Sequence, residues 1–190
     1  MTEFESQLIQ HCSPTLLGLK QANLFSFEKE KIHNYATEIQ SYNQCLNPLD
    51  IYIEALYCCP ERIFLLVYHK EKMLQYLQTP AVSLFLEKEG YPAQPGVASN
   101  FRKVMAHLKQ RTNNYSEFPH EIGFFLGYPL EDVFGFIHQK GKNYKCFGYW
   151  KVYGNESKAK KLFQQYESCR DILWKKATSG VPILTLLGAA

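Results

Sequence analysis

Hydrophobic residues recur at every third or fourth position over much of this chain. That spacing places them on one face of a helix, so each such stretch predicts an amphipathic helix. Asn47-Pro48 and Thr79-Pro80 are typical of the points where such helices stop. Helices are predicted over residues 3–11, 29–45, 70–78, 81–88, 97–111, 119–127, 129–138 and 156–176.

Runs rich in β-branched and aromatic residues separate some of these helices. They predict strands over residues 23–27, 51–58, 63–68 and 145–153. Only four residues, 59–62, link the second strand to the third, which predicts an antiparallel hairpin. We therefore predict a single α+β domain over residues 1–190, with a small sheet of about four short strands wrapped by helices.

Cys12 precedes Ser13-Pro14, a pair typical of a helix start, because Ser caps helices well and Pro suits the first helical position. A helix beginning at Pro14 would place the Cys12 thiol at the positive end of the helix dipole, which lowers the pKa of a thiol. Cys12 is therefore a candidate nucleophile or metal ligand. The alternative is a buried cysteine that packs the start of the chain.

His120 and Glu121 form the second candidate, with Glu131-Asp132 ten residues further on, because an imidazole near a carboxylate can act as a general base or bind a metal. Adjacent helical side chains diverge, however, so an alternative is that Glu121 stabilises a helix N-terminus while His120 lies on the surface. If Cys12 and His120 meet in space, they form the thiol–imidazole pair of a thiol hydrolase. Lys20 would then stabilise the developing anion.

Aromatic residues alternate with lysines around residues 144–153. Tyr149, Trp150 and Lys151 could stack a flat cofactor ring such as a flavin. The alternative is a strand that packs its aromatic side chains in the core and exposes its lysines. No glycine-rich loop of the dinucleotide-binding or P-loop kind accompanies this segment.

Charge is distributed unevenly, although the formal net charge is only +3. Residues 138–190 contain ten Lys or Arg and three acidic residues, whereas residues 1–60 contain three Lys and seven acidic residues. The basic C-terminal third predicts an acidic partner or ligand, and a solvated helix face is the alternative. The small net charge argues against dedicated binding of duplex nucleic acid.

The six cysteines show no C-x-x-C spacing, so neither a zinc ribbon nor a thioredoxin-like motif is indicated. The acidic, polar first residues lack the features of a secretory signal. No apolar run reaches about 18 residues, the length that a membrane span needs. We therefore expect a cytoplasmic protein with free thiols and no membrane span.

Several motifs stand out along the chain. They read His-Cys-Ser-Pro-Thr-Leu at residues 11–16, Gly-Leu-Lys at 18–20, Phe-Pro-His-Glu-Ile-Gly at 118–123, Leu-Gly-Tyr-Pro at 126–129 and Gly-Tyr-Trp-Lys-Val-Tyr at 148–153. Together they resemble domain-of-unknown-function family 3793, over nearly the whole chain. The resemblance implies an origin in clostridia and other anaerobic Firmicutes. Members of the family are often encoded near flavodoxins and ferrous-iron transport genes, which implies a role in iron or redox physiology. The resemblance favours the polar candidates inside the motifs, which are Cys12, Lys20, His120, Glu121 and Lys151.

Three functions compete. The leading one is an iron- or redox-linked accessory protein that binds iron through Cys12 and His120 and docks an acidic partner such as a flavodoxin. The second is a thiol enzyme with Cys12 as nucleophile and His120 as base. The third is a non-catalytic interaction module, whose residues 148–151 and apolar tail, residues 181–190, contact a partner. The oligomeric state stays open.

Overall fold

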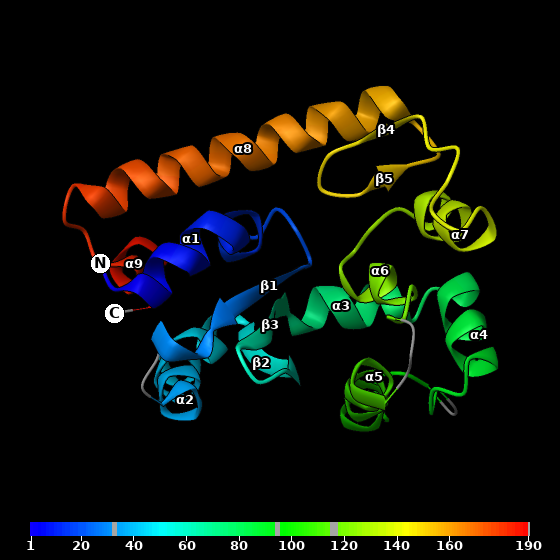
Figure 1. Ribbon diagram of the computed structural model, residues 1–190, viewed down its shortest axis with the longest axis horizontal. Coiled ribbons are helices and arrows are strands. Elements are labelled where there is room, and N and C mark those ends of the chain that lie inside the picture. Colours follow the sequence, from blue (N-terminus) through cyan, green and yellow to red (C-terminus); the bar gives the residue numbers. More distant parts are fainter. Residues whose placement is uncertain (32–33, 94–95, 115–117, 190) are drawn as a thin grey trace. The chain divides into compact units, whose positions relative to one another are not determined.

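The computed structural model describes residues 1–31, 34–93, 96–114 and 118–189. Helices and short antiparallel strands make up this part of the chain (Figure 1), so the predicted α+β class is confirmed. In chain order the elements are α1 (Glu3–Leu16), β1 (Ala22–Glu28), η1 (Lys29–Lys31), α2 (Tyr35–Leu46), η2 (Asn47–Leu49), β2 (Ile51–Cys58), β3 (Arg62–His69), α3 (Lys70–Leu77), α4 (Pro80–Lys88), α5 (Phe101–Asn114), α6 (Ile122–Phe125), α7 (Leu130–His138), β4 (Cys146–Phe147), β5 (Lys151–Val152), α8 (Glu156–Thr178) and α9 (Ile183–Leu186).

Contacts between residues divide the chain into two compact units. The first unit comprises Met1–Lys70 and Gln165–Ala190, and the second unit comprises Glu71–Gln164. Helix α8 contributes residues to both. Each unit is described by itself below, and the single domain over residues 1–190 stays a prediction.

The first unit contains a three-stranded antiparallel sheet in the order β1-β3-β2. Strand β3 lies in the middle, and its Leu65 pairs with Phe25 of β1. The predicted hairpin of residues 51–58 and 63–68 is confirmed, because β2 and β3 pair antiparallel over these stretches. Alternate residues of a strand point to opposite faces, so every second residue of β3 faces the same core.

The core of the first unit lies on one face of this sheet. Buried apolar side chains from α1, α2, α8, α9 and all three strands form one cluster, which includes Leu8, Cys12, Phe27, Ile53 and Leu65. Burial of this apolar surface is the main force that holds the helices on the sheet.

The apolar C-terminal tail belongs to the same cluster. Helix α9 buries Ile183, and Leu184, Leu186 and Leu187 pack against the cluster. These apolar side chains of the tail thus contact the core of the chain itself. Val181 is 37% exposed, and the surface for a partner at residues 181–190 stays a prediction.

Helix α1 corrects the prediction that a helix starts at Pro14. The helix starts at Glu3, where Thr2 and Glu5 form a reciprocal capping box, and it continues through Pro14 to Leu16. The capping box satisfies two of the donors that the helix N-terminus leaves unpaired. Ser13-Pro14 therefore lies in the last turn of a helix, and Cys12 does not precede an N-terminus.

The predicted strand at residues 145–153 is instead a tight hairpin in the second unit. Strands β4 and β5 pair Cys146 with Val152 and form a separate two-stranded sheet, so the predicted four-stranded sheet is wrong. Gly148 lies in the turn, where an added Cβ would come within 2.5 Å of the Phe163 ring. The close approach of this ring requires glycine at the turn, and the glycine interrupts the strand.

The final helix is confirmed. Asn155 caps α8, because its Oδ1 accepts a hydrogen bond of 2.9 Å from the Lys158 N–H. Helix α8 is 23 residues long, but charged residues occur throughout it. Within the described ranges, no helix combines the length and the apolar character needed to cross a membrane.

Candidate functional site

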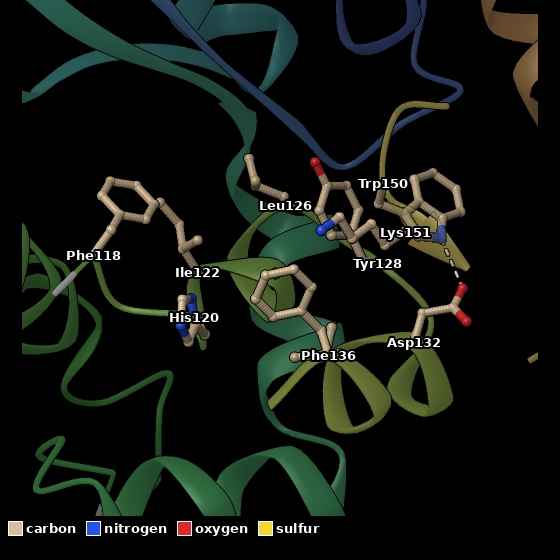
Figure 2. A pocket seen from close by; sticks show the side chains of 11 residues that line it. Phe118, His120, Ile122, Leu126, Tyr128, Asp132, Phe136, Trp150 and Lys151 are labelled. Carbon is tan, nitrogen blue, oxygen red and sulfur yellow. Dashed lines mark hydrogen bonds between the residues drawn. The ribbon is translucent and has the colours of Figure 1, made fainter. Parts of the chain in front are cut away.

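The second unit contains a cavity of about 330 Å³ (Figure 2). Most of the side chains around it are apolar or aromatic. They come from the segment before α6, from α6, from the α6–α7 link, from α7 and from the β4–β5 hairpin. The lining residues are Phe118, His120, Ile122, Gly123, Leu126, Tyr128, Asp132, Val133, Phe136, Trp150 and Lys151.

Asp132 fixes one wall of the cavity. Its carboxylate is buried, with 3% of its surface exposed, and it accepts a hydrogen bond of 2.7 Å from the indole N–H of Trp150. The backbone N–H groups of Tyr153 and Gly154 donate to its other oxygen at 2.7 and 2.8 Å. Bonds to an ionised acceptor are stronger than those between neutral groups. One side chain of α7 therefore holds the hairpin and orients the indole.

Tyr128 and Trp150 form an aromatic wall. Their rings stack with centroids 4.9 Å apart, and the Trp150 ring meets the Phe163 ring edge-on at 4.6 Å. The Tyr128 hydroxyl donates to the Tyr149 carbonyl at 3.2 Å, and burial raises the pKa of Tyr128 to about 12. The hydroxyl thus stays protonated and keeps its bond at neutral pH. These contacts preform the wall without a ligand.

His120 and Lys151 both lie next to the aromatic ring of Phe136, which lines the cavity. The His120 imidazole meets the Phe136 ring edge-on, with centroids 4.9 Å apart. The Lys151 ammonium lies 5.6 Å from the centre of that ring and 4.9 Å from the centre of the Tyr144 ring. It also donates to the Gly141 carbonyl at 2.8 Å. Figure 2 shows the Lys151 side chain extended toward Phe136.

The cavity unites three of the residues singled out from the sequence: His120, Trp150 and Lys151. Tyr149 is next to the cavity but does not line it, because its ring packs on Phe163 with centroids 5.6 Å apart. Trp150 is buried, whereas Lys151 is half-buried. The alternative, in which this segment buries its aromatic side chains and exposes its lysines, therefore holds for Trp150 but not for Lys151.

Glu121 diverges from His120, as adjacent helical positions predict. It is buried, with 4% of its surface exposed, and it forms an ion pair with the Arg111 guanidinium. The Tyr91 hydroxyl donates to it at 3.0 Å, and burial next to this carboxylate raises the pKa of Tyr91. Both interactions give Glu121 a structural role, and it does not line the cavity.

Cys12 and Lys20 lie in the first unit. Cys12 is fully buried in α1, and burial raises the pKa of its thiol. Lys20, with 4% of its surface exposed, has its pKa lowered to about 7 by burial, although the nearby thiol acts in the opposite direction. Cys12 does not lie at a helix N-terminus, so the predicted dipole does not lower the pKa of its thiol. The nearby Lys20 amine favours the thiolate, but the effect of burial is larger.

These surroundings bear on the proposed iron ligands. A buried, protonated thiol beside an amine does not fit an iron ion, which needs a deprotonated ligand. No group of three or more His, Cys, Asp or Glu that could hold a metal occurs in the described part of the chain. His120 belongs to the second unit, so its pairing with Cys12 stays a prediction.

Three lining residues, Tyr128, Asp132 and Phe136, were given no place among the predicted site residues, although Tyr128 lies in one of the motifs and Asp132 was noted near His120. They occur at four-residue intervals, and Asp132 and Phe136 share one face of α7. An acidic residue on the apolar face of a helix is the signal that could have identified Asp132.

Comparison with protein families matches residues 8–187 to the family described as "Protein of unknown function (DUF3793)". The resemblance drawn from the motifs is thereby confirmed. No curated protein and no solved structure matches the chain.

Proposed function

The chain belongs to this DUF3793 family, and we propose that it is a small-molecule-binding protein whose cavity in the second unit takes a flat, largely apolar ligand. The observation that carries the proposal is the cavity itself. Its volume of about 330 Å³ lies in the range of small-molecule sites, and it has an apolar lining with few polar groups.

The shape of the ligand is inferred from the rings around the cavity. The aromatic side chains of Phe118, Tyr128, Phe136 and Trp150 line it together with the His120 imidazole. Aromatic rings favour flat partners, because offset-stacked and edge-on contacts add to the burial of apolar surface. A flat aromatic ligand therefore uses more of this lining than an aliphatic ligand of the same volume.

The walls also support binding because they are already in place. Asp132 holds the hairpin and the Trp150 indole in one position, and Tyr128 stacks on that indole. A preformed site loses little conformational entropy when its ligand enters, so more of the contact energy appears as affinity.

Binding is better supported than thiol catalysis. The described side chains that line the cavity include neither a thiol nor the hydroxyl of a serine or threonine. Cys12, the predicted nucleophile, lies in the core of the other unit with a raised pKa. The iron-linked role, the redox role and the flavodoxin partner stay predictions that rest on the family resemblance.

A neutral dye tests the proposal. N-phenyl-1-naphthylamine emits strongly when it leaves water for an apolar site, and we expect it to bind saturably with one site per chain. Phe118 is exposed and lines the cavity, so Phe118→Ala should weaken binding without disturbing the core. Phe136→Ala removes a ring that two other lining side chains contact, and should weaken it about tenfold or more.

Phe147→Ala is the matched control, because Phe147 is 73% exposed and does not line the cavity. It should leave the affinity for the dye unchanged. Emission that never saturates, or an equal loss in the cavity variants and in Phe147→Ala, would contradict the proposal. Circular dichroism of each variant identifies any that fails to fold.

A further inference from the structure

The Lys151 ammonium has hydrogen-bonding capacity that the protein does not use. An ammonium carries three N–H donors, and the Gly141 carbonyl accepts from it at 2.8 Å. The other contacts of this nitrogen are with the faces of the Phe136 and Tyr144 rings. Among the described residues, no carboxylate lies within ion-pair distance of Lys151.

The hairpin that lines one side of the cavity lies in a positively charged segment. Residues 138–154, which include the hairpin, contain four lysines and neither Asp nor Glu. Among the described residues, Asp132 is the one carboxylate that lines the cavity, and three hydrogen bonds from the segment 150–154 use its two oxygens. The carboxylate is therefore engaged by the protein, whereas the Lys151 ammonium can still bind a negative group.

We propose that the ligand of the cavity is an aromatic acid, with flat rings that contact the aromatic lining and a carboxylate that binds the Lys151 ammonium. This inference rests on the proposed function and names the chemical class of the ligand. Rings on one side of the ammonium exclude water there, and an ion pair is stronger where water is partly excluded.

His120 supplies a second polar group that can bind the carboxylate of the ligand. Its imidazole contacts the Phe136 ring at 4.9 Å, and the Lys151 ammonium lies over that ring as well. Both side chains thus reach the space next to one ring, so the carboxylate of a ligand stacked there lies near a cation and near an imidazole N–H. The other polar groups of the lining hold the wall: Asp132 binds the Trp150 indole, and the Tyr128 hydroxyl binds the Tyr149 carbonyl.

A matched pair of probes tests the charge of the ligand. 2-Naphthoate and 2-naphthamide have the same rings and nearly the same shape, but only the first is an anion. Each is used to displace N-phenyl-1-naphthylamine from the full chain. We expect 2-naphthoate to displace the dye at an about tenfold lower concentration than 2-naphthamide.

Variants of Lys151 assign the preference to its ammonium. Lys151→Gln should abolish the preference, so that 2-naphthoate and 2-naphthamide displace the dye at the same concentration, while Lys151→Arg should keep the preference. Lys161→Gln removes the same charge from an exposed position of α8 and should behave like the parent chain. Saturable binding of the dye by Lys151→Gln, with one site per chain, shows that its cavity is intact.

Two failures are distinguishable. If the dye binds and both probes displace it equally in the parent chain, or if Lys151→Gln keeps the preference, the aromatic acid is overturned and the cavity remains a binding site. If the dye and both probes do not bind, the proposed function itself is overturned.

Discussion

The two units place similar side chains in opposite surroundings. In the first unit, Cys12 and Lys20 are buried within or beside an apolar core, where burial raises the pKa of the thiol and lowers that of the amine. In the second unit, His120 and Lys151 lie at a cavity, beside an aromatic ring. A reactive residue type becomes useful only where a ligand can reach it, and this is why the proposed binding site lies in the second unit.

The largest expected effect concerns Asp132, whose hydrogen bonds hold the β4–β5 hairpin of the second unit. Asp132→Ala leaves three donors of the hairpin without their acceptor, and should lower the free energy of unfolding by about 4 kcal/mol. Urea unfolding followed by tryptophan emission measures the change. Glu167→Ala, which removes a carboxylate from an exposed position of α8, is the control, and a similar loss in both variants would show that Asp132 does not hold the hairpin.

A core substitution in the first unit sharpens the contrast. Leu65→Ala removes a fully buried side chain and should lower the free energy of unfolding by about 3 kcal/mol. Because all the described residues that line the cavity belong to the second unit, the affinity of the folded variant for N-phenyl-1-naphthylamine should not change. Leu84→Ala, at a largely exposed position, serves as the control for stability. Dye binding that weakens in Leu65→Ala would mean that the first unit takes part in binding.

A smaller effect follows from the buried amine of the first unit. Burial lowers the pKa of Lys20 to about 7, whereas an unfolded lysine titrates at about 10.4. Between these values the unfolded chain binds more protons, so the free energy of unfolding rises with pH, by at most about 1.4 kcal/mol per pH unit. Cys12 acts in the opposite sense, because its raised pKa lowers stability once unfolded thiols ionise, above about pH 8.5.

Urea unfolding between about pH 7 and pH 8.5 isolates the contribution of Lys20. Lys20→Met should flatten the rise, and Lys176→Met, at an exposed position of the same unit, should retain it. An equal slope in the parent chain and in Lys20→Met would show that the amine keeps its ordinary pKa.

The sequence predicted elements that depend on neighbours along the chain. The helices at residues 70–78 and 81–88 and the β2–β3 hairpin are found as predicted, because spacing and turn length determine them. The β4–β5 hairpin was missed because its turn depends on the Phe163 ring, which packs on Gly148 from a later helix. A contact across such a distance leaves no local pattern.

The candidate site was predicted in part for the same reason. His120, Trp150 and Lys151 were identified from aromatic and polar motifs, and the cavity joins them. Cys12 was misjudged because Ser-Pro signals a helix start, whereas the Thr2 capping box starts the helix earlier and puts the thiol in the core. The role of Asp132 appears only when the hairpin folds back onto α7, which no spacing in the chain predicts.

The most direct test observes the cavity from within. The chain has two tryptophans, so a ¹⁵N-labelled sample gives two indole N–H signals, and Trp174→Phe assigns the remaining one to Trp150. The Trp150 indole lines the cavity and is held by Asp132, whereas Trp174 lies in the first unit. On titration with 2-naphthamide, the Trp150 signal should shift saturably while the Trp174 signal stays in place. A probe that binds saturably without shifting the Trp150 signal would contradict the assignment of this cavity as the binding site.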